Sequence, residues 1–290
     1  MVLKLPGQLV STEWLEMHLE HPALRILDAT VYLHPTSNNQ MRMESGINDY
    51  GAGHIPGAVF ADLIEDLSDP ESSLRFTLPS AERFATNIGK LGVGDENVVV
   101  VYSGGSMSWA PRLWLMLKAF GFDHVAVLDG GWHKWSSEGR PTSNHPSRYP
   151  GATFTPKFRE GIFVDQNTVE DARSDRKSII VNALSPEQHS GEGGAHYGRP
   201  GRIANSVNVP AAALLDRHTF AFRPAGEIAM AFDAVGATEE KRLVIYCGGG
   251  IAASQVAFAQ ALIGRPAAAV YDASLQEWAM DKEAAMETDF

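Results

Sequence analysis

The chain has 290 residues, and its 44% hydrophobic content is sufficient for the cores of two domains of ordinary size. Its formal net charge of -11 disfavours nucleic-acid backbones and anionic membranes, so neither is expected as a partner. The single cysteine excludes an intramolecular disulfide and a thiolate-rich zinc site within one chain, and it favours a reducing compartment.

The N-terminal segment, residues 1–7, has no continuous apolar region of signal-sequence length, and no later stretch approaches the ~20 residues of a membrane span. We therefore expect a soluble cytoplasmic protein. None of the ten histidines belongs to a pair at metal-ligand spacing on a convincing helix, so no metal site is predicted.

The first half alternates strand-like and helix-like segments. Residues 24–29 read as a strand, and residues 35–53 are loop-like and long enough for a flap. Ser80 is placed to cap a helix that Gly92 ends. Residues 98–135 then give an apolar strand, a glycine-rich loop, a helix, a second strand and a tryptophan.

The second half follows the same order. Residues 139–151 are rich in proline, serine and glycine, which predicts a linker between the halves. A capping-box pattern at Asn167 predicts a helix that ends at Ser174, and residues 178–183 read as the next strand. Residues 190–202 form a second loop-like segment.

The most informative stretch begins with the apolar strand 242–246. Cys247, the only cysteine, comes directly after this strand. Three glycines then lead into a helix predicted over 252–263, which Gly264 stops. The sequence therefore predicts a strand, a tight loop that contains the cysteine, and a helix.

An internal repeat relates the two halves. Residues 98–135 and 242–278 share the same order of elements, and the separation between tyrosine and tryptophan differs by one residue between the two copies. Alternating strands and helices at this spacing indicate right-handed βαβ units on a parallel sheet. We therefore predict an α/β protein with two similar domains, over 1–138 and 161–290, joined by a linker over 139–160.

The position of Cys247 suits nucleophilic chemistry. A glycine-rich loop directs several backbone N–H groups at one point, and the helix N-terminus adds a field that favours negative charge. The thiol is expected to be acidified there. The alternative is a buried structural cysteine, which more often lies within a strand or a helix.

Other reaction classes fit the sequence less well. The first copy of the repeat has Ser103 where the second has the cysteine, so the first half is predicted to be catalytically silent. A serine hydrolase needs glycine where Ser108 stands, and a cysteine phosphatase needs arginine where Ala253 stands. No Walker loop or dinucleotide fingerprint occurs, so no nucleotide site is predicted.

Together these features resemble the tandem rhodanese family, the thiosulfate and 3-mercaptopyruvate sulfurtransferases. The resemblance covers almost the whole chain and rests on residues 53–58, 128–132 and 246–252 and on the position of the linker. It implies two tandem rhodanese-like domains, each a parallel sheet flanked by helices. Only the second would be catalytic, with residues 247–252 as a loop at the interface.

The resemblance also implies the reaction. A small-molecule donor, which is thiosulfate, 3-mercaptopyruvate or another persulfide source, transfers sulfur to Cys247 as a persulfide, and cyanide or a thiol removes it. No cofactor is required. The amides expected to stabilise the anionic sulfur belong to Gly248, Gly249, Gly250, Ile251 and Ala252.

Several residues depart from the family pattern. The loop lacks the basic residues of thiosulfate-preferring members, and it has Gly249 where mercaptopyruvate enzymes commonly have Ser or Thr. Those enzymes also place arginines for the substrate carboxylate where this chain has Leu184 and Ser190. Arg199 and Arg202 have two readings: they replace the missing arginines, or they are solvated loop charges.

Asp62 also has two readings. It matches an acidic position that lines the cleft in the mercaptopyruvate enzymes, and the alternative is a surface or turn carboxylate. The leading hypothesis is a sulfurtransferase. The missing arginines motivate the competing hypothesis of a non-catalytic rhodanese-like module that carries persulfide sulfur or binds a partner.

Overall fold

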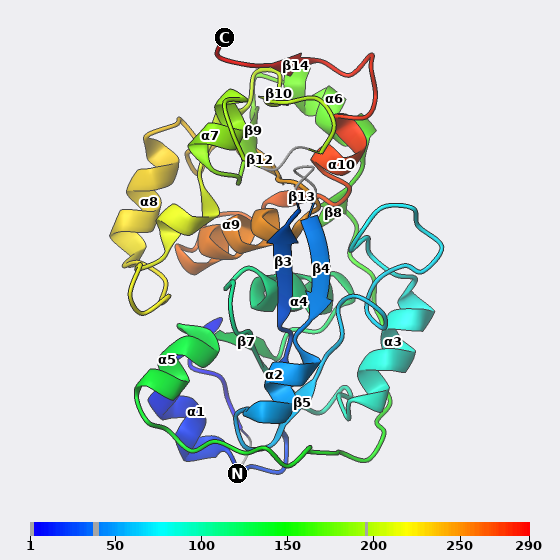
Figure 1. The fold of residues 1–290 in the computed structure, drawn as a ribbon, viewed down its shortest axis with the longest axis vertical. Helices are drawn as coiled ribbons and strands as arrows, with labels where there is room; N and C mark the ends of the chain where they lie inside the picture. The colour runs from blue at the N-terminus through cyan, green and yellow to red at the C-terminus, as the bar shows by residue number, and fades with distance from the viewer. Residues whose placement is uncertain (1–2, 37–40, 195–196) are drawn as a thin grey trace.

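The computed structural model describes residues 3–36, 41–194 and 197–290. It contains two five-stranded parallel sheets, one in each half of the chain (Figure 1). Figure 1 shows the first half at the bottom and the second half at the top, with helices α4 (Trp109–Ala119) and α9 (Ile251–Leu262) between them. Among the described residues, no helix is both long enough and apolar enough to cross a membrane.

The first sheet has the strand order β1-β7-β6-β2-β5. Its strands are β1 (Leu9–Val10), β2 (Leu24–Asp28), β5 (Ala58–Phe60), β6 (Val98–Tyr102) and β7 (Val125–Leu128). The helices of this half, besides α4, are α1 (Thr12–His18), α2 (Ile47–Ala52), α3 (Ala81–Lys90) and α5 (Gly131–Ser137).

The second sheet has the order β11-β9-β12-β13-β8. Its strands are β8 (Phe163–Val164), β9 (Ser178–Asn182), β11 (Val207–Asn208), β12 (Arg242–Tyr246) and β13 (Ala269–Tyr271). The helices besides α9 are α6 (Gln166–Ser174), α7 (Pro186–Ser190), the short 3₁₀ helix η1 (Ala211–Leu214), α8 (Ala225–Asp233) and α10 (Leu275–Trp278). The strands β10 (Arg202–Ile203) and β14 (Met286–Glu287) pair antiparallel at one side.

The two sheets have equivalent strand orders when the second is listed from its other edge, as β8-β13-β12-β9-β11. In the first, β2 pairs with β6 in parallel, and the last pair is Asp28 opposite Tyr102. In the second, β9 pairs with β12 in parallel, and the last pair is Asn182 opposite Tyr246. The predicted α/β fold with two similar parallel sheets is confirmed. The short edge strands β1 and β8 were not predicted.

The predicted helices are present, with one change of cap. Ser80 caps α3 as expected, because its Oγ accepts a hydrogen bond from the Arg83 amide at 3.2 Å. The cap of α6 is Asp165 rather than Asn167, since its Oδ1 accepts from the Thr168 amide at 2.9 Å. This helix therefore begins at Gln166.

The predicted loop over 35–53 contains regular structure. A hairpin of β3 (Val31–Pro35) and β4 (Met41–Ser45) is followed by α2. Burial alternates along both strands, which is the period-two pattern of a strand. In Figure 1 the hairpin extends from the first half toward the second. Residues 37–40 of this segment, and residues 195 and 196 of the other predicted loop, lie outside the described residues.

A single hydrophobic core spans both halves, because α4 packs on α9 between the sheets. The rings of Trp114 and Phe258 meet edge to face with their centroids 4.8 Å apart. Arg112 of α4, only 1% exposed, forms an ion pair of 2.7 Å with Asp272, which follows β13. Removing one partner of such a buried pair typically costs about 3–5 kcal/mol. These contacts fix the position of one half on the other.

Residues 139–160, the predicted linker, contain no helix or strand and follow the first half along its surface. Ser143 and His54 exchange two backbone hydrogen bonds of 2.8 and 2.9 Å. Further along, the Lys157 amide donates to the Phe120 carbonyl at 2.8 Å. The limits of the two domains on either side stay a prediction.

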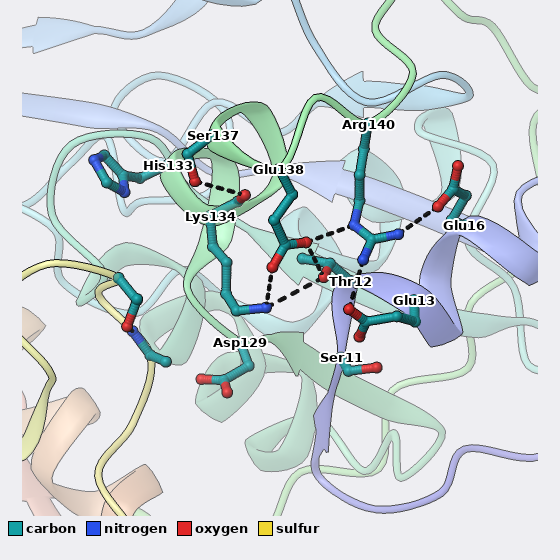
Figure 2. Close-up of polar contacts among 12 residues, drawn as sticks. Ser11, Thr12, Glu13, Glu16, Asp129, His133, Lys134, Ser137, Glu138 and Arg140 are labelled. Atoms are coloured by element: carbon teal, nitrogen blue, oxygen red, sulfur yellow. Dashed lines mark hydrogen bonds and ion pairs between the residues drawn. The ribbon is translucent and has the colours of Figure 1, made fainter.

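An ion-pair cluster holds the start of this segment to α1 and α5 (Figure 2). Arg140 pairs with Glu138 at 2.6 Å and with two glutamates of α1. Figure 2 shows Lys134 and Arg140 on different sides of the Glu138 carboxylate, and Thr12 also donates to it, at 2.5 Å. Burial acts to raise the pKa of Glu138, but hydrogen bonds from Lys134, Thr12 and Arg140 lower it to about 2.

We predict that Glu138→Gln removes a pH-dependent part of the stability. The ordinary pKa of 4.5 applies to the unfolded chain, so the contribution of Glu138 is complete above this pH and is lost as the pH falls through about 2. The melting temperature, followed by circular dichroism, should be higher for the unaltered protein than for the variant at about pH 6. The difference should shrink toward about pH 2. A difference that stays constant over this range would contradict the assignment.

Candidate active site

The loop that contains the cysteine lies at the carboxyl end of β12, a central strand of the second sheet. Cys247 is 2% exposed and has a free thiol. Gly250 ends the loop with φ at 77°, a left-handed conformation that favours glycine, and α9 begins at the next residue. The predicted order of strand, glycine loop and helix is therefore present, and α9 directs its N-terminus toward the loop.

Ser274 holds this loop in shape. Its Oγ accepts hydrogen bonds from the amides of Cys247 at 3.1 Å and Gly250 at 3.2 Å, and it donates to the carbonyl of Tyr271 at 2.7 Å. Ser274 itself is fully buried and has φ at 54°, which is unusual for a residue other than glycine. A strained residue is thus kept at the position where one hydroxyl can bridge both ends of the loop.

The remaining amides of the loop are available to a ligand. The backbone N–H groups of Gly248, Gly249, Ile251 and Ala252 have no acceptor in the part of the chain that the structure describes. Those of Ile251 and Ala252 are in the first turn of α9, where no intrahelical acceptor exists. Free amides at a helix N-terminus form an anion site, so this loop can stabilise negative charge on sulfur.

A cavity of about 360 Å³ opens above the cysteine, between the two halves. The second half contributes the loop itself, Leu184, Gln188, Tyr197 and Gln276. The first half contributes the hairpin, through Val31, Tyr32, Leu33 and Met41, and also Arg75, Phe76, Ser106, Ser108 and Trp109. Most of these side chains are apolar or aromatic, which is typical of a small-molecule site.

Tyr197 packs directly on the loop. A Cβ placed on Gly248 would lie 1.9 Å from the Tyr197 ring, so only glycine leaves space for the phenol. Burial, with a smaller effect from the nearby Cys247 thiolate, raises the pKa of Tyr197 well above its ordinary value of 10. The phenol therefore stays protonated and can act as a hydrogen-bond donor beside the thiol.

Arg75 is the only charged residue among the described side chains that line the cavity. Its backbone is held by Gln276 of α10: the Arg75 amide donates to Gln276 Oε1 at 3.0 Å, and Gln276 Nε2 donates to the Arg75 carbonyl at 2.8 Å. The Gln276 amide in turn donates to the Gly248 carbonyl at 2.9 Å. One glutamine thus joins the cysteine loop to the cation.

The structure places the sequence-predicted residues in two groups. Cys247, Gly248, Gly249, Ile251 and Ala252 line the cavity together, and Gly250 lies behind them, where Ser274 holds it. The other three, Arg199, Arg202 and Asp62, do not line it.

Each of these three residues has partners of its own. The Arg199 guanidinium donates to four backbone carbonyls around the end of α10, including that of Ala284 at 2.7 Å. Arg202 pairs with Asp289 at 2.7 Å. Asp62 closes a turn, because its Oδ1 accepts from the amides of Ile64 and Glu65 at 2.8 and 3.0 Å. The structure does not bring any of them to Cys247.

The equivalent loop of the first half is filled by its own side chains. Ser103 Oγ donates to the Ser106 carbonyl at 2.9 Å, and the Gly104 amide donates to Thr30 Oγ1 at 2.7 Å. A Cβ on Gly105 would lie 2.7 Å from the Tyr32 ring. This loop has no thiol, and the Tyr32 ring lies over Gly105.

The internal repeat contains a sequence feature that points to Ser274. Where the first copy has Gly131 with φ at 52°, the second has Ser274 with nearly the same φ. A serine at a position suited to glycine indicates that its hydroxyl has a role. No comparable signal exists for Arg75, Tyr197 and Gln276, because their contacts depend on loops that only the fold brings together.

Comparison with known proteins gives consistent matches. A family model described as a rhodanese-like domain matches residues 11–138 and 165–281. The thiosulfate sulfurtransferase of Rattus norvegicus is 34% identical over 93% of this chain and 91% of its own. The 3-mercaptopyruvate sulfurtransferase of Homo sapiens is 33% identical over 94% of this chain and 92% of its own. The crystal structure of SseA from Escherichia coli, described as a 3-mercaptopyruvate sulfotransferase, has a TM-score of 0.82 at 29% identity and covers 92% of this chain and 98% of that one.

The contact of Tyr197 with the loop predicts unequal effects of two glycine substitutions. Gly248→Ala must displace the Tyr197 ring, and overpacking of this kind costs about 1–3 kcal/mol. In Gly249→Ala the new Cβ would lie 3.1 Å from the far end of the flexible Gln276 side chain, which can move. The free energy of unfolding in urea should therefore fall more for Gly248→Ala. Equal losses for the two variants would contradict this packing.

Proposed function

The chain belongs to the family of rhodanese-like proteins and is a sulfurtransferase, and on this premise we propose that it moves one sulfur atom through a persulfide on Cys247. The observation that carries the proposal is the geometry of the loop. Its thiol lies at the floor of a largely apolar cavity, next to four amides without an acceptor among the described residues. Sequence relatives named for thiosulfate and for 3-mercaptopyruvate match the chain over similar lengths.

The first step forms the persulfide. The thiolate of Cys247 attacks the outer sulfur of thiosulfate, and the sulfur–sulfur bond breaks with its electron pair leaving on sulfite. With 3-mercaptopyruvate the carbon–sulfur bond breaks instead, and the enolate that leaves takes up a proton to give pyruvate. In both cases the enzyme then carries a terminal sulfur with a negative charge, which the free amides and the N-terminus of α9 stabilise.

The second step returns the enzyme to its starting state. Cyanide or a thiolate attacks the terminal sulfur, the persulfide bond breaks, and the electron pair stays on Cys247 as the thiolate. Donor and acceptor use the same cavity in turn. The buried position of the thiol keeps the persulfide away from bulk solvent between the two steps.

We also propose the cytoplasm as the location of this reaction. The support is the cysteine usage of the chain: its only cysteine is a free thiol, and a chain without disulfides suits a reducing compartment.

The proposed chemistry predicts a sharp difference between two equivalent positions. Cys247→Ser should lower kcat for thiocyanate formation more than about a thousandfold, because a serine hydroxyl is not ionised at neutral pH. Ser103→Ala, in the silent loop, is the matched control and should keep the activity. Initial rates with thiosulfate or 3-mercaptopyruvate and with cyanide should give the parallel lines of a double-displacement reaction.

Two outcomes would count against the proposal. Turnover retained by Cys247→Ser would exclude this residue as the nucleophile. No turnover by the unaltered protein with either donor would favour the non-catalytic module that carries sulfur or binds a partner.

A further inference from the structure

The cationic residue of this cavity does not lie at the positions where the family pattern has arginines for the substrate carboxylate. The two positions that hold arginines in the mercaptopyruvate enzymes are Leu184 and Ser190 here. Leu184 lines the cavity as an apolar side chain. The positively charged residue that lines the cavity is Arg75, which belongs to the first half of the chain and lies shortly before α3.

From this arrangement we infer that Arg75 is the anion-recognition residue of the site, and that it selects an organic donor with one carboxylate over the dianion thiosulfate. The inference rests on the proposed function for the identity of the reaction.

The backbone around Arg75 is fixed from several sides. Gln276 holds both its amide and its carbonyl. At the next residue, the Phe76 carbonyl accepts from the buried Arg112, and the Phe76 ring lies against Trp109 with centroids 4.9 Å apart. The Leu78 amide donates to Asp272 Oδ2 at 2.7 Å. Because this backbone is fixed before a ligand binds, less conformational entropy is lost on binding.

The guanidinium itself is available to a ligand. One of its nitrogens donates to the Met41 carbonyl of the hairpin, and its other N–H groups have no acceptor among the described residues. Arg75 forms no ion pair with any carboxylate in the described ranges. Arg75 lines the same cavity as Tyr197 and Cys247. A guanidinium with free donors binds a carboxylate in two-point contact.

The balance of charge favours a monoanion. A donor that enters the cavity meets the negative Cys247 thiolate, one exposed guanidinium and a set of amides. One carboxylate can be paired with Arg75, but thiosulfate brings a second charge that has no cation among the described lining residues. Removing an unpaired charge from water is costly, so the dianion should bind more weakly.

The shape and lining of the cavity favour an organic body. Its volume of about 360 Å³ is on the order of ten times the ~30 Å³ share of one water in the liquid, which is more than a small inorganic anion fills. Phe76, Trp109 and Leu184 offer apolar surface in the same cavity. A carboxylate on an apolar or aromatic body uses both features.

The first test measures binding without turnover. The Cys247→Ser protein is titrated calorimetrically with pyruvate, phenylpyruvate and thiosulfate, alone and with Arg75→Gln added. We expect phenylpyruvate to bind more tightly than pyruvate and at least about tenfold more tightly than thiosulfate. Arg75→Gln should weaken binding of both carboxylates about tenfold, the usual effect of losing one charge-assisted hydrogen bond.

The matched control is Arg42→Gln, on the hairpin whose Met41 carbonyl accepts from Arg75. Arg42 pairs with Glu44 at 2.9 Å and does not line the cavity, so this change removes an equal charge outside the site. Carboxylate affinities that fall equally in both variants would overturn the inference, since they would show only the effect of net charge. Thiosulfate that binds as tightly as phenylpyruvate would overturn the selection of a monoanion.

The second test uses the active enzyme. With 3-mercaptopyruvate, Arg75→Gln should raise KM about tenfold and leave kcat nearly unchanged, because the contact is the same in ground and transition states. Arg75→Lys should recover part of the loss. If no donor turns over but the carboxylates still bind in an Arg75-dependent way, the proposed function fails and the inference about Arg75 holds.

Discussion

The hydroxyl of Ser274 is the interaction on which the site depends. It bridges the amides of Cys247 and Gly250, and it does so from a backbone conformation that is costly for serine. Two residues before Ser274, Asp272 is anchored across the interface by the buried Arg112. The ion pair between the halves and the shape of the cysteine loop therefore belong to one connected structure. Removing either partner of such a pair leaves an uncompensated charge at the interface, which is strongly destabilising.

Ser274 accepts from two backbone amides of the cysteine loop, and the remaining amides of the loop are left for a ligand. With both ends of the loop fixed, the N–H groups between and after them stay without an acceptor among the described residues. The first half completes the site, because its hairpin and the Arg75 segment form the wall that faces the thiol. Its own loop has Ser103 where the second half has Cys247, and the Gly104 amide of that loop is already bonded to Thr30. The first half thus forms part of the wall of the cavity over Cys247.

Much of this could be predicted from the sequence, because it depends on local pattern. The apolar strands, the glycine loop before α9 and the repeat of both were visible as periodicity and spacing. They predicted the fold, which is confirmed, and they singled out Cys247 as the proposed nucleophile. The hairpin at β3 and β4 was missed because its alternation was short and its strands were half exposed. Long side chains in loops were beyond such reasoning: Arg199 lies near the site in sequence but bonds to carbonyls of α10, and Arg75 enters the cavity from the other half.

The central claim is that Cys247 carries the transferred sulfur in a loop built to hold negative charge. Mass spectrometry of the intact protein after incubation with 3-mercaptopyruvate or thiosulfate, followed by peptide mapping, tests it most directly. The account predicts a mass increase of one sulfur atom, located on the peptide that contains Cys247 and removed by cyanide. An unchanged mass with both donors, or sulfur bound elsewhere in the chain, would contradict it.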